Sequence, residues 1–283
     1  MKLIRYGNPG EEKPGILIDG KRFDVSDIIE DYDTAFFGSD GITDLQDKID
    51  AHSLKEVDAD VRWGVPMARP GKIVCIGLNY ADHAAESGMD APEEPVIFFK
   101  ATSSMVGPYD DVIIPKGSEK TDWEVELGVV IGKKASYVTE AEAMNHVAGY
   151  VLHNDVSERA FQIERGGQWV KGKSCDTFAP VGPWIATPDE ISDVNNLNLW
   201  LKINGKKLQD GTSADLIFKI PHIIHYLSQF MTLEPGDIIS TGTPAGVGLG
   251  LNPPTFLKPG DVMELGIDGL GSSKQHVKAY SGQ

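Results

Sequence analysis

Three carboxylates near the middle of the chain have a spacing that suggests chemistry. In the stretch TDWEVELGVVIGK, residues 121–133, an acid stands at every second position: Asp122, Glu124 and Glu126. Side chains point to alternate faces of a strand, so a single strand here would place the three carboxylates on one face. The next residues, 127–131, are apolar or glycine, which predicts that the strand runs into a core.

Two interpretations of this carboxylate strand stay open on its sequence alone. Buried carboxylates repel one another and cannot stay charged without partners. A hard cation with oxygen ligands, such as magnesium, manganese or calcium, would satisfy them. A solvated polar face on an edge strand, with lysines opposite, would explain the same pattern without a metal.

A histidine and a glutamate form a second candidate pair. The pattern predicts a short helix over residues 80–87, with Asn79 as its N-cap and Gly88 at its end. His83 and Glu86 are three residues apart on this helix, so they should lie on one face within reach of each other.

A third group of polar residues follows a predicted strand over residues 149–154. Asp155 ends this strand, and Arg159 and Gln162 come four and seven positions later. If this segment is helical, the three side chains line one face. Lys173 follows in a glycine-rich loop. Taken singly, Arg159 is explained as well by a surface ion pair.

Two glycine-rich motifs invite a nucleotide-binding interpretation that the context does not support. Residues 167–174, GQWVKGKS, match the phosphate-loop pattern, but polar residues precede them and two prolines follow, where the motif needs a strand and a helix. We therefore expect a chance match. Residues 242–250, GTPAGVGLG, are instead predicted to form a turn-rich loop whose backbone NH groups and Thr243 hydroxyl hold an anion.

Composition and sequence pattern indicate the class of protein and the fold that positions these residues. The net charge of −16 over 283 residues argues against nucleic acid and anionic membrane surfaces as partners. No signal peptide or membrane span is visible, and two cysteines make no disulfide framework, so a cytoplasmic protein is expected.

Short strands and few helices predict a mostly β (α+β) fold. Helices are expected over residues 139–146 and 220–231, and a hairpin is expected at Asn204-Gly205. The chain is expected to form a small N-terminal domain (1–70) and a main domain (71–283).

Several segments of the main domain resemble the fumarylacetoacetate hydrolase family in the same order. They are IGLNYADHAAE, EPVIFFK, DWEVELGVVIGK, GYVLHNDVSER, KGKSCDTFAPVGPW, LKINGK and GDIISTGTPAGVG. The nearest similarity is to bacterial members that act on 2,4-diketo-3-deoxy-L-fuconate and rhamnonate. The resemblance implies a mixed β-roll core, a bound Mg²⁺, Mn²⁺ or Ca²⁺, and a homodimer. It also implies that the metal ligands are Glu124, Glu126 and Asp155, and that Asp122 is not one.

The chemistry implied by this resemblance is hydrolysis of a C–C bond in a 2,4-diketo acid. His83, oriented by Glu86, would take a proton from water, and Lys173 would stabilise the developing oxyanion. The substrate carboxylate would be oriented by three side chains: Arg159, Gln162 and Thr243. Three rivals stay open: a ureidoglycolate lyase, an oxaloacetate decarboxylase or keto–enol tautomerase on the same site, and a non-enzymatic metal- or ligand-binding module.

Overall fold

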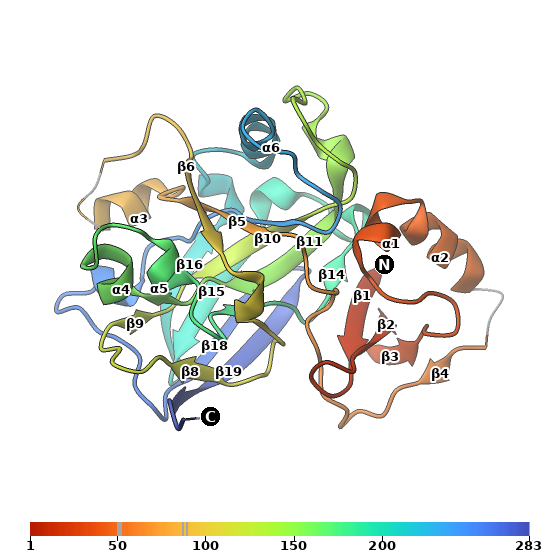
Figure 1. Ribbon diagram of the computed structural model, residues 1–283, viewed down its shortest axis with the longest axis horizontal. Coiled ribbons are helices and arrows are strands. Elements are labelled where there is room, and N and C mark those ends of the chain that lie inside the picture. The colour runs from red at the N-terminus through yellow and green to blue at the C-terminus, as the bar shows by residue number, and fades with distance from the viewer. Residues whose placement is uncertain (50–52, 87, 89, 283) are drawn as a thin grey trace.

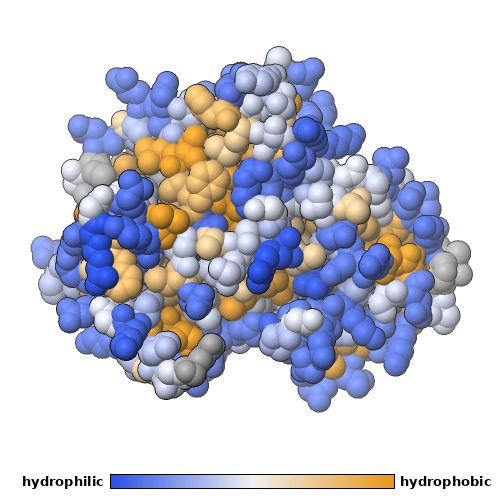
Figure 2. All heavy atoms as spheres, viewed as in Figure 1, coloured by the Kyte–Doolittle hydropathy of each residue, from blue (hydrophilic) through white to orange (hydrophobic). Residues whose placement is uncertain are grey.

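The computed structural model describes residues 1–49, 53–86, 88 and 90–282, which form a small and a large lobe (Figure 1). The small lobe is red to orange in Figure 1, and it lies on the right in the space-filling view of Figure 2 as well. The fold is mostly β with short helices, as predicted. The small-lobe elements are β1 (Lys2–Tyr6), β2 (Lys13–Ile18), β3 (Lys21–Asp24), α1 (Thr34–Gly38), α2 (Gly41–Ile49) and β4 (Lys55–Glu56).

One ten-stranded mixed sheet runs through both lobes in the order β4-β3-β2-β1-β14-β11-β10-β17-β5-β6. The β17–β5 pair is parallel and the other pairs are antiparallel. Because β1 pairs with β14 across the lobes, the division into residues 1–70 and 71–283 stays a prediction. The large-lobe strands are β5 (Ile73–Gly77), β6 (Val96–Lys100), β10 (Val125–Ile131), β11 (Val147–Asn154), β14 (Ile185–Ala186) and β17 (Ile238–Ser240).

A second sheet of five strands, in the order β16-β15-β18-β19-β8, packs against β10 and β11. Its strands are β8 (Val112–Ile114), β15 (Asn198–Ile203), β16 (Lys206–Thr212), β18 (Val262–Ile267) and β19 (Gly271–Ala279). Leu127, Leu152 and Leu265 are among the fully buried side chains of the core cluster that these strands share. Each such side chain contributes roughly 1.5–3 kcal/mol on burial, so this layer fixes β10 and β11 rigidly.

Two sequence predictions of local structure are confirmed in this layer. The hairpin between β15 and β16 turns at Asn204-Gly205, where both residues have positive φ, 50° and 80°. This geometry is the turn that an Asn-Gly pair favours. Helix α6 (Ile220–Ser228) confirms most of the predicted helix and buries Ile220, Ile223, Ile224 and Leu227, but it ends three residues before the predicted position 231, and Phe230 is exposed.

The prediction of one continuous strand over residues 121–133 is wrong. Thr121–Asp122 form β9, which pairs with β12 (Ser157–Glu158), and β10 starts only at Val125. Between them the Trp123 indole donates to the Gly246 carbonyl at 3.0 Å, and the Glu124 amide donates to a side-chain oxygen of Asn154 at 3.3 Å. These tertiary contacts replace ladder hydrogen bonds, so the chain kinks where the carboxylates lie.

The prediction of a helix over residues 139–146 is also wrong. The Glu142 carboxylate accepts from the Thr139 amide at 3.3 Å and from the Thr139 hydroxyl at 2.6 Å, as at the start of a capped helix. The chain continues only as a 3-10 turn, Ala143–His146, because Val147 already starts β11.

Three short helices border the polar residues of the large lobe: α3 (Ala81–Glu86), α4 (Arg159–Ile163) and α5 (Val170–Lys173). Helix α3 confirms the predicted helix over Ala81–Glu86, whereas Tyr80 precedes it as a bridge to Leu216, and Ser87 lies outside the described residues. Asn79 is not its cap, since the side-chain oxygen Oδ1 of Asn79 accepts from the Phe218 amide at 2.7 Å. Helix α4, and not a strand, precedes residues 167–174, which confirms that this is no phosphate loop.

Within the described ranges, no helix is long and apolar enough to cross a membrane.

Candidate active site

Three buried carboxylates converge at the end of β10 and β11. Glu124, Glu126 and Asp155 each offer an oxygen, and these oxygens all lie within 4.8 Å of one another. The antiparallel pairing sets Val125 opposite Asn154, so Asp155 follows directly beside Glu124, and its amide donates to the Glu124 carbonyl at 2.9 Å. The structure thus brings together the ligand set that the resemblance implies.

Two buried lysines balance the charge of this triad. Lys173 Nζ lies 2.6 Å from Glu124 and 2.9 Å from Asp155, and Lys100 Nζ lies 2.5 Å from Asp155. Burial alone would raise the pKa of both carboxyl groups. Lys100 and Lys173 outweigh burial at Asp155, and Lys173 and Arg159 outweigh it at Glu124, so the pKa of each carboxyl group is lowered. The sequence analysis missed Lys100. Lys100 could have been found because it is the single charge at the end of the apolar strand VIFF, where a buried lysine requires an anionic partner.

Glu126 is the least compensated member of the triad. It accepts from Ser240 Oγ at 2.5 Å and from the Gly242 amide at 2.9 Å, and no lysine contacts it among the described residues. Burial, followed by repulsion from Asp155 and Glu124, raises the pKa of Glu126 to about 8. A divalent cation among the three carboxylates would relieve this repulsion, and an all-oxygen donor set fits Mg²⁺, Mn²⁺ or Ca²⁺.

A buried histidine, His153, contacts Glu126 through the Ser240 hydroxyl. The sequence analysis missed this residue too. His153 Nδ1 lies 2.6 Å from the Ser240 hydroxyl that donates to Glu126. Where that hydroxyl donates to Glu126, a neutral His153 ring donates to the hydroxyl from Nδ1. Burial lowers the pKa of His153 to about 3, so the ring is neutral.

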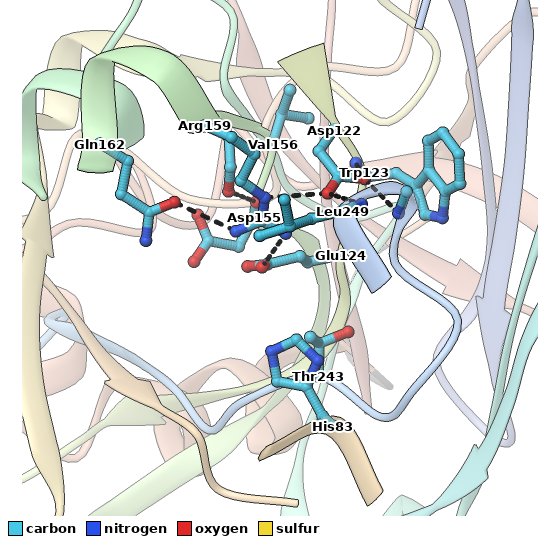
Figure 3. A network of polar contacts seen from close by, with 12 residues as sticks. His83, Asp122, Trp123, Glu124, Asp155, Val156, Arg159, Gln162, Thr243 and Leu249 are labelled. Carbon is cyan, nitrogen blue, oxygen red and sulfur yellow. Dashed lines mark hydrogen bonds and ion pairs between the residues drawn. The ribbon is translucent and has the colours of Figure 1, made fainter. Parts of the chain in front are cut away.

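Arg159 is buried and fully engaged with the protein, so its interpretation as a surface ion pair is wrong. Figure 3 shows its guanidinium between Asp122 and Glu124, with contacts of 2.8 Å and 2.7 Å. Its third nitrogen donates to the Gln162 carbonyl oxygen at 3.1 Å. The guanidinium therefore orients Glu124 and Gln162 with three of its five N–H donors, and the second N–H of Nη1 and of Nη2 can serve the predicted contact with a substrate carboxylate.

Asp122 has a structural role in this site and is not a member of the triad. Besides Arg159, it accepts from the backbone amides of Gly248 and Leu249 at 2.6 Å and 2.9 Å. The carboxylate thereby ties β9 to α4 and to the loop over residues 242–250.

Replacing Asp122 with alanine is expected to destabilise the protein by about 3–5 kcal/mol, since the substitution leaves a buried arginine half-paired. Urea unfolding followed by circular dichroism measures this change in the free energy of unfolding. The matched control is Asp210→Ala, which removes an exposed partner of Lys207 and should cost at most about 1 kcal/mol. Equal losses in the two variants would contradict the structural role of Asp122.

The loop over residues 242–250 holds anions, as predicted, but the anions are carboxylates of this chain. Its amides bind Glu126 through Gly242, Glu86 through Gly246, and Asp122 through Gly248 and Leu249. The Thr243 hydroxyl donates to the Val125 carbonyl at 2.9 Å and accepts from Gln209 at 2.8 Å, so it is held by the protein as well.

His83 faces the triad across a pocket. In Figure 3 the imidazole lies opposite Glu124 with open space between them. The cavity has a volume of about 310 Å³, and all predicted site residues line it except Asp155 and Glu86. Asp155 lies beneath the two lysines that bind it, and Glu86 lies behind His83.

Glu86 contacts His83 as the helical spacing predicts. Its carboxylate is 3.8 Å from His83 Nδ1 and accepts from the Gly246 amide at 2.9 Å. Burial favours a higher pKa for Glu86, but the contacts with His83 and the Gly246 amide outweigh it and lower that pKa. The carboxylate is therefore ionised at neutral pH. A small rotation of the ring would bring Nδ1, which is buried without a hydrogen-bond partner among the described residues, into contact with it.

A buried oxygen-donor cluster that faces an imidazole across a pocket defines a candidate catalytic centre for metal-dependent chemistry. The family model described as fumarylacetoacetate (FAA) hydrolase C-terminal matches residues 72–278. The chain belongs to the fumarylacetoacetate hydrolase family.

Individual relatives share the whole length of the chain. A Burkholderia multivorans protein, provisionally named a hydrolase, is 53% identical over 281 residues and covers 99% of both chains. The solved fumarylacetoacetate hydrolase of Exiguobacterium antarcticum is 34% identical, with a TM-score of 0.84 over 99% of this chain and 100% of that one. The solved 5-carboxymethyl-2-hydroxymuconate delta-isomerase of Mycobacterium smegmatis is 30% identical, with a TM-score of 0.79 over 100% of both.

The family therefore contains enzymes with hydrolase and with isomerase activities, and its members commonly use a divalent metal.

Proposed function

We propose that this protein is a divalent-metal-dependent hydrolase that cleaves a C–C bond of a 2,4-diketo acid. The observation that carries the proposal is the pocket in which the acidic triad faces His83. Glu124, Glu126 and Asp155 would hold Mg²⁺, Mn²⁺ or Ca²⁺. When bound, the cation supplies Lewis-acid stabilisation for negative charge that develops on the substrate oxygens.

His83 is the general base in this proposal. Hydrolysis adds water to the C4 carbonyl, breaks the C3–C4 bond, and yields a carboxylic acid and a 2-keto acid. His83 takes the proton of the attacking water, and the ionised Glu86 stabilises the imidazolium that forms. The C3 carbon then recovers a proton from this imidazolium, so the step is balanced without an outside acid.

Lys173 and Gln162 have positions that suit transition-state stabilisation and orientation. Lys173 Nζ is buried between two triad carboxylates at the floor of the pocket, where its charge can stabilise a developing oxyanion. Gln162 turns its amide nitrogen toward the open space in Figure 3, where it can donate to the substrate carboxylate. Arg159 and Thr243 complete the predicted substrate side of the pocket.

A decarboxylase or isomerase acting on a related keto acid is the second candidate, because an isomerase is among the solved relatives. Such a reaction uses the same triad but needs no attacking water. The prediction that the substrate is a 2,4-diketo-3-deoxy sugar acid concerns only the tail of the substrate beyond C4. The homodimer, the cytoplasmic location and the absence of nucleic-acid or membrane partners stay predictions.

Glu126→Gln tests the ligand assignment. The amide keeps the shape of the side chain and can still accept from Ser240 and Gly242, so unfolding stability should stay near wild type. Affinity for Mn²⁺, measured by isothermal titration calorimetry, should fall roughly 100-fold or more, beyond the usual cost of losing an outer-shell partner. The control Glu264→Gln changes a partly exposed carboxylate on β18 and should leave affinity unchanged. Equal affinity in both variants would remove Glu126 from the ligand set.

A further inference from the structure

The outer part of the candidate pocket is apolar. Beyond the charged centre, the side chains that line it are Ile76, Leu78, Phe98, Ile163, Trp169 and Leu249. They come from β5, β6, α4, the residue before α5 and the loop over 242–250, so five separate segments contribute to one apolar wall.

Contacts place this wall on the path from Lys173 to the mouth. Lys173 Nζ lies 4.8 Å from the centre of the Phe98 ring, and the Phe98 and Trp169 rings are 5.4 Å apart. The Trp169 indole packs against the backbone of Gly77, where an added Cβ would come within 2.8 Å of it. Ile163 is 50% exposed at the rim. A substrate whose carboxylate end binds at the centre must therefore extend its tail along Phe98 and Trp169.

The polar side chains of the pocket lie at its charged centre, where Arg159 binds Asp122, Glu124 and Gln162, and Thr243 binds Val125 and Gln209. In the apolar wall, the indole NH of Trp169 is the one side-chain hydrogen-bonding group among the six described residues. Most hydroxyls of a polyhydroxylated tail would therefore lose their water against this wall without gaining a partner, which is unfavourable.

We propose that the substrate tail beyond C4 is a short apolar acyl group and not a polyhydroxylated sugar chain. The proposal rests on the proposed function, and it deepens that function by assigning a specificity role to Trp169 and Ile163. A cavity of about 310 Å³ is at the small end of ligand sites, which limits the tail to a few carbons.

Four synthetic 2,4-dioxo acids test the tail with the Mg²⁺-loaded protein: the methyl-tailed pentanoate, the ethyl-tailed hexanoate, the propyl-tailed heptanoate, and the 5,6-dihydroxylated hexanoate. We expect kcat/KM to rise about fourfold per added methylene, following the burial of each CH₂ group. The dihydroxylated acid should fall below its ethyl-tailed counterpart.

Trp169→Ala and Ile163→Ala should flatten the dependence on tail length, lowering kcat/KM for the propyl tail more than for the methyl tail. Comparing each variant with wild type cancels the intrinsic reactivity of each substrate. Ile163 is a rim residue, so its truncation keeps the test valid if the tryptophan variant folds poorly. Trp200→Ala, on β15 where the indole packs against Gly266, is the matched control and should keep the wild-type dependence.

A preference for the dihydroxylated acid, or a tail-length dependence that both pocket variants retain, would overturn the apolar-tail proposal while the hydrolase assignment stands. Failure of the wild-type protein to cleave any of the four acids would instead overturn the proposed function, and the tail proposal with it.

Discussion

Exhaustive removal of divalent metal should abolish turnover of a 2,4-diketo acid, and Mg²⁺ or Mn²⁺ should restore it. The triad carboxylates lie within 4.8 Å of one another in a buried site, and Glu126 lacks a cationic partner among the described residues. Without a divalent cation, the site lacks the Lewis acid that would stabilise the developing enolate. The measurement is steady-state activity after dialysis against EDTA, with metal content determined on the same samples.

The fold should survive this treatment, which separates a catalytic metal from a structural one. Lys100 and Lys173 already neutralise Asp155 and Glu124, so the metal-free protein retains buried ion pairs that hold the triad. Circular dichroism should be unchanged by EDTA, and the thermal midpoint should rise with added metal, as expected for a ligand that binds the native state. Full activity in protein shown to be free of metal would contradict the proposed function.

Local sequence patterns predicted the elements whose contacts are local or periodic. The Asn204-Gly205 turn, the apolar stripe of α6 and the apolar run of β10 each follow from residue type and spacing. Glu124 and Glu126 belong to the alternating acids that are visible in the sequence, but this pattern left a metal site and a solvated face open and did not separate Asp122 from the ligands. The resemblance to a family then added Asp155, which periodicity alone would have left as the end of a strand.

Other features depend on residues far apart in the chain, and no local pattern encodes them. The kink between β9 and β10 requires Gly246 and Asn154, and Lys100 meets its partner 55 residues later. The loop over 242–250 looks like a generic anion site until the fold shows that three separate segments supply the carboxylates it binds. The wrongly predicted helix over residues 139–146 shows the converse. The contact between Thr139 and Glu142 does not produce a helix, because the next strand already begins at Val147.

His83→Ala should lower hydrolysis on the order of 10²–10⁴-fold, the usual contribution of a positioned general base. The imidazole faces Glu124 across the pocket and contacts no carboxylate of the triad among the described residues. Metal affinity should therefore stay near wild type. Steady-state kinetics on a 2,4-diketo acid, with calorimetric metal binding on the same preparations, measures both quantities. His276→Ala, an exposed histidine on β19, is the matched control.

The same variant separates hydrolysis from the second candidate reaction. Water attack needs a base, whereas decarboxylation of oxaloacetate chiefly needs stabilisation of the enolate, so decarboxylation should fall much less in His83→Ala. Loss of metal in this variant would make His83 a ligand. Hydrolysis within a few-fold of wild type would exclude His83 as the base. Equal losses of both activities would mean that His83 and Glu86 serve a proton transfer common to both reactions, and the hydrolase assignment would lose its mechanistic support.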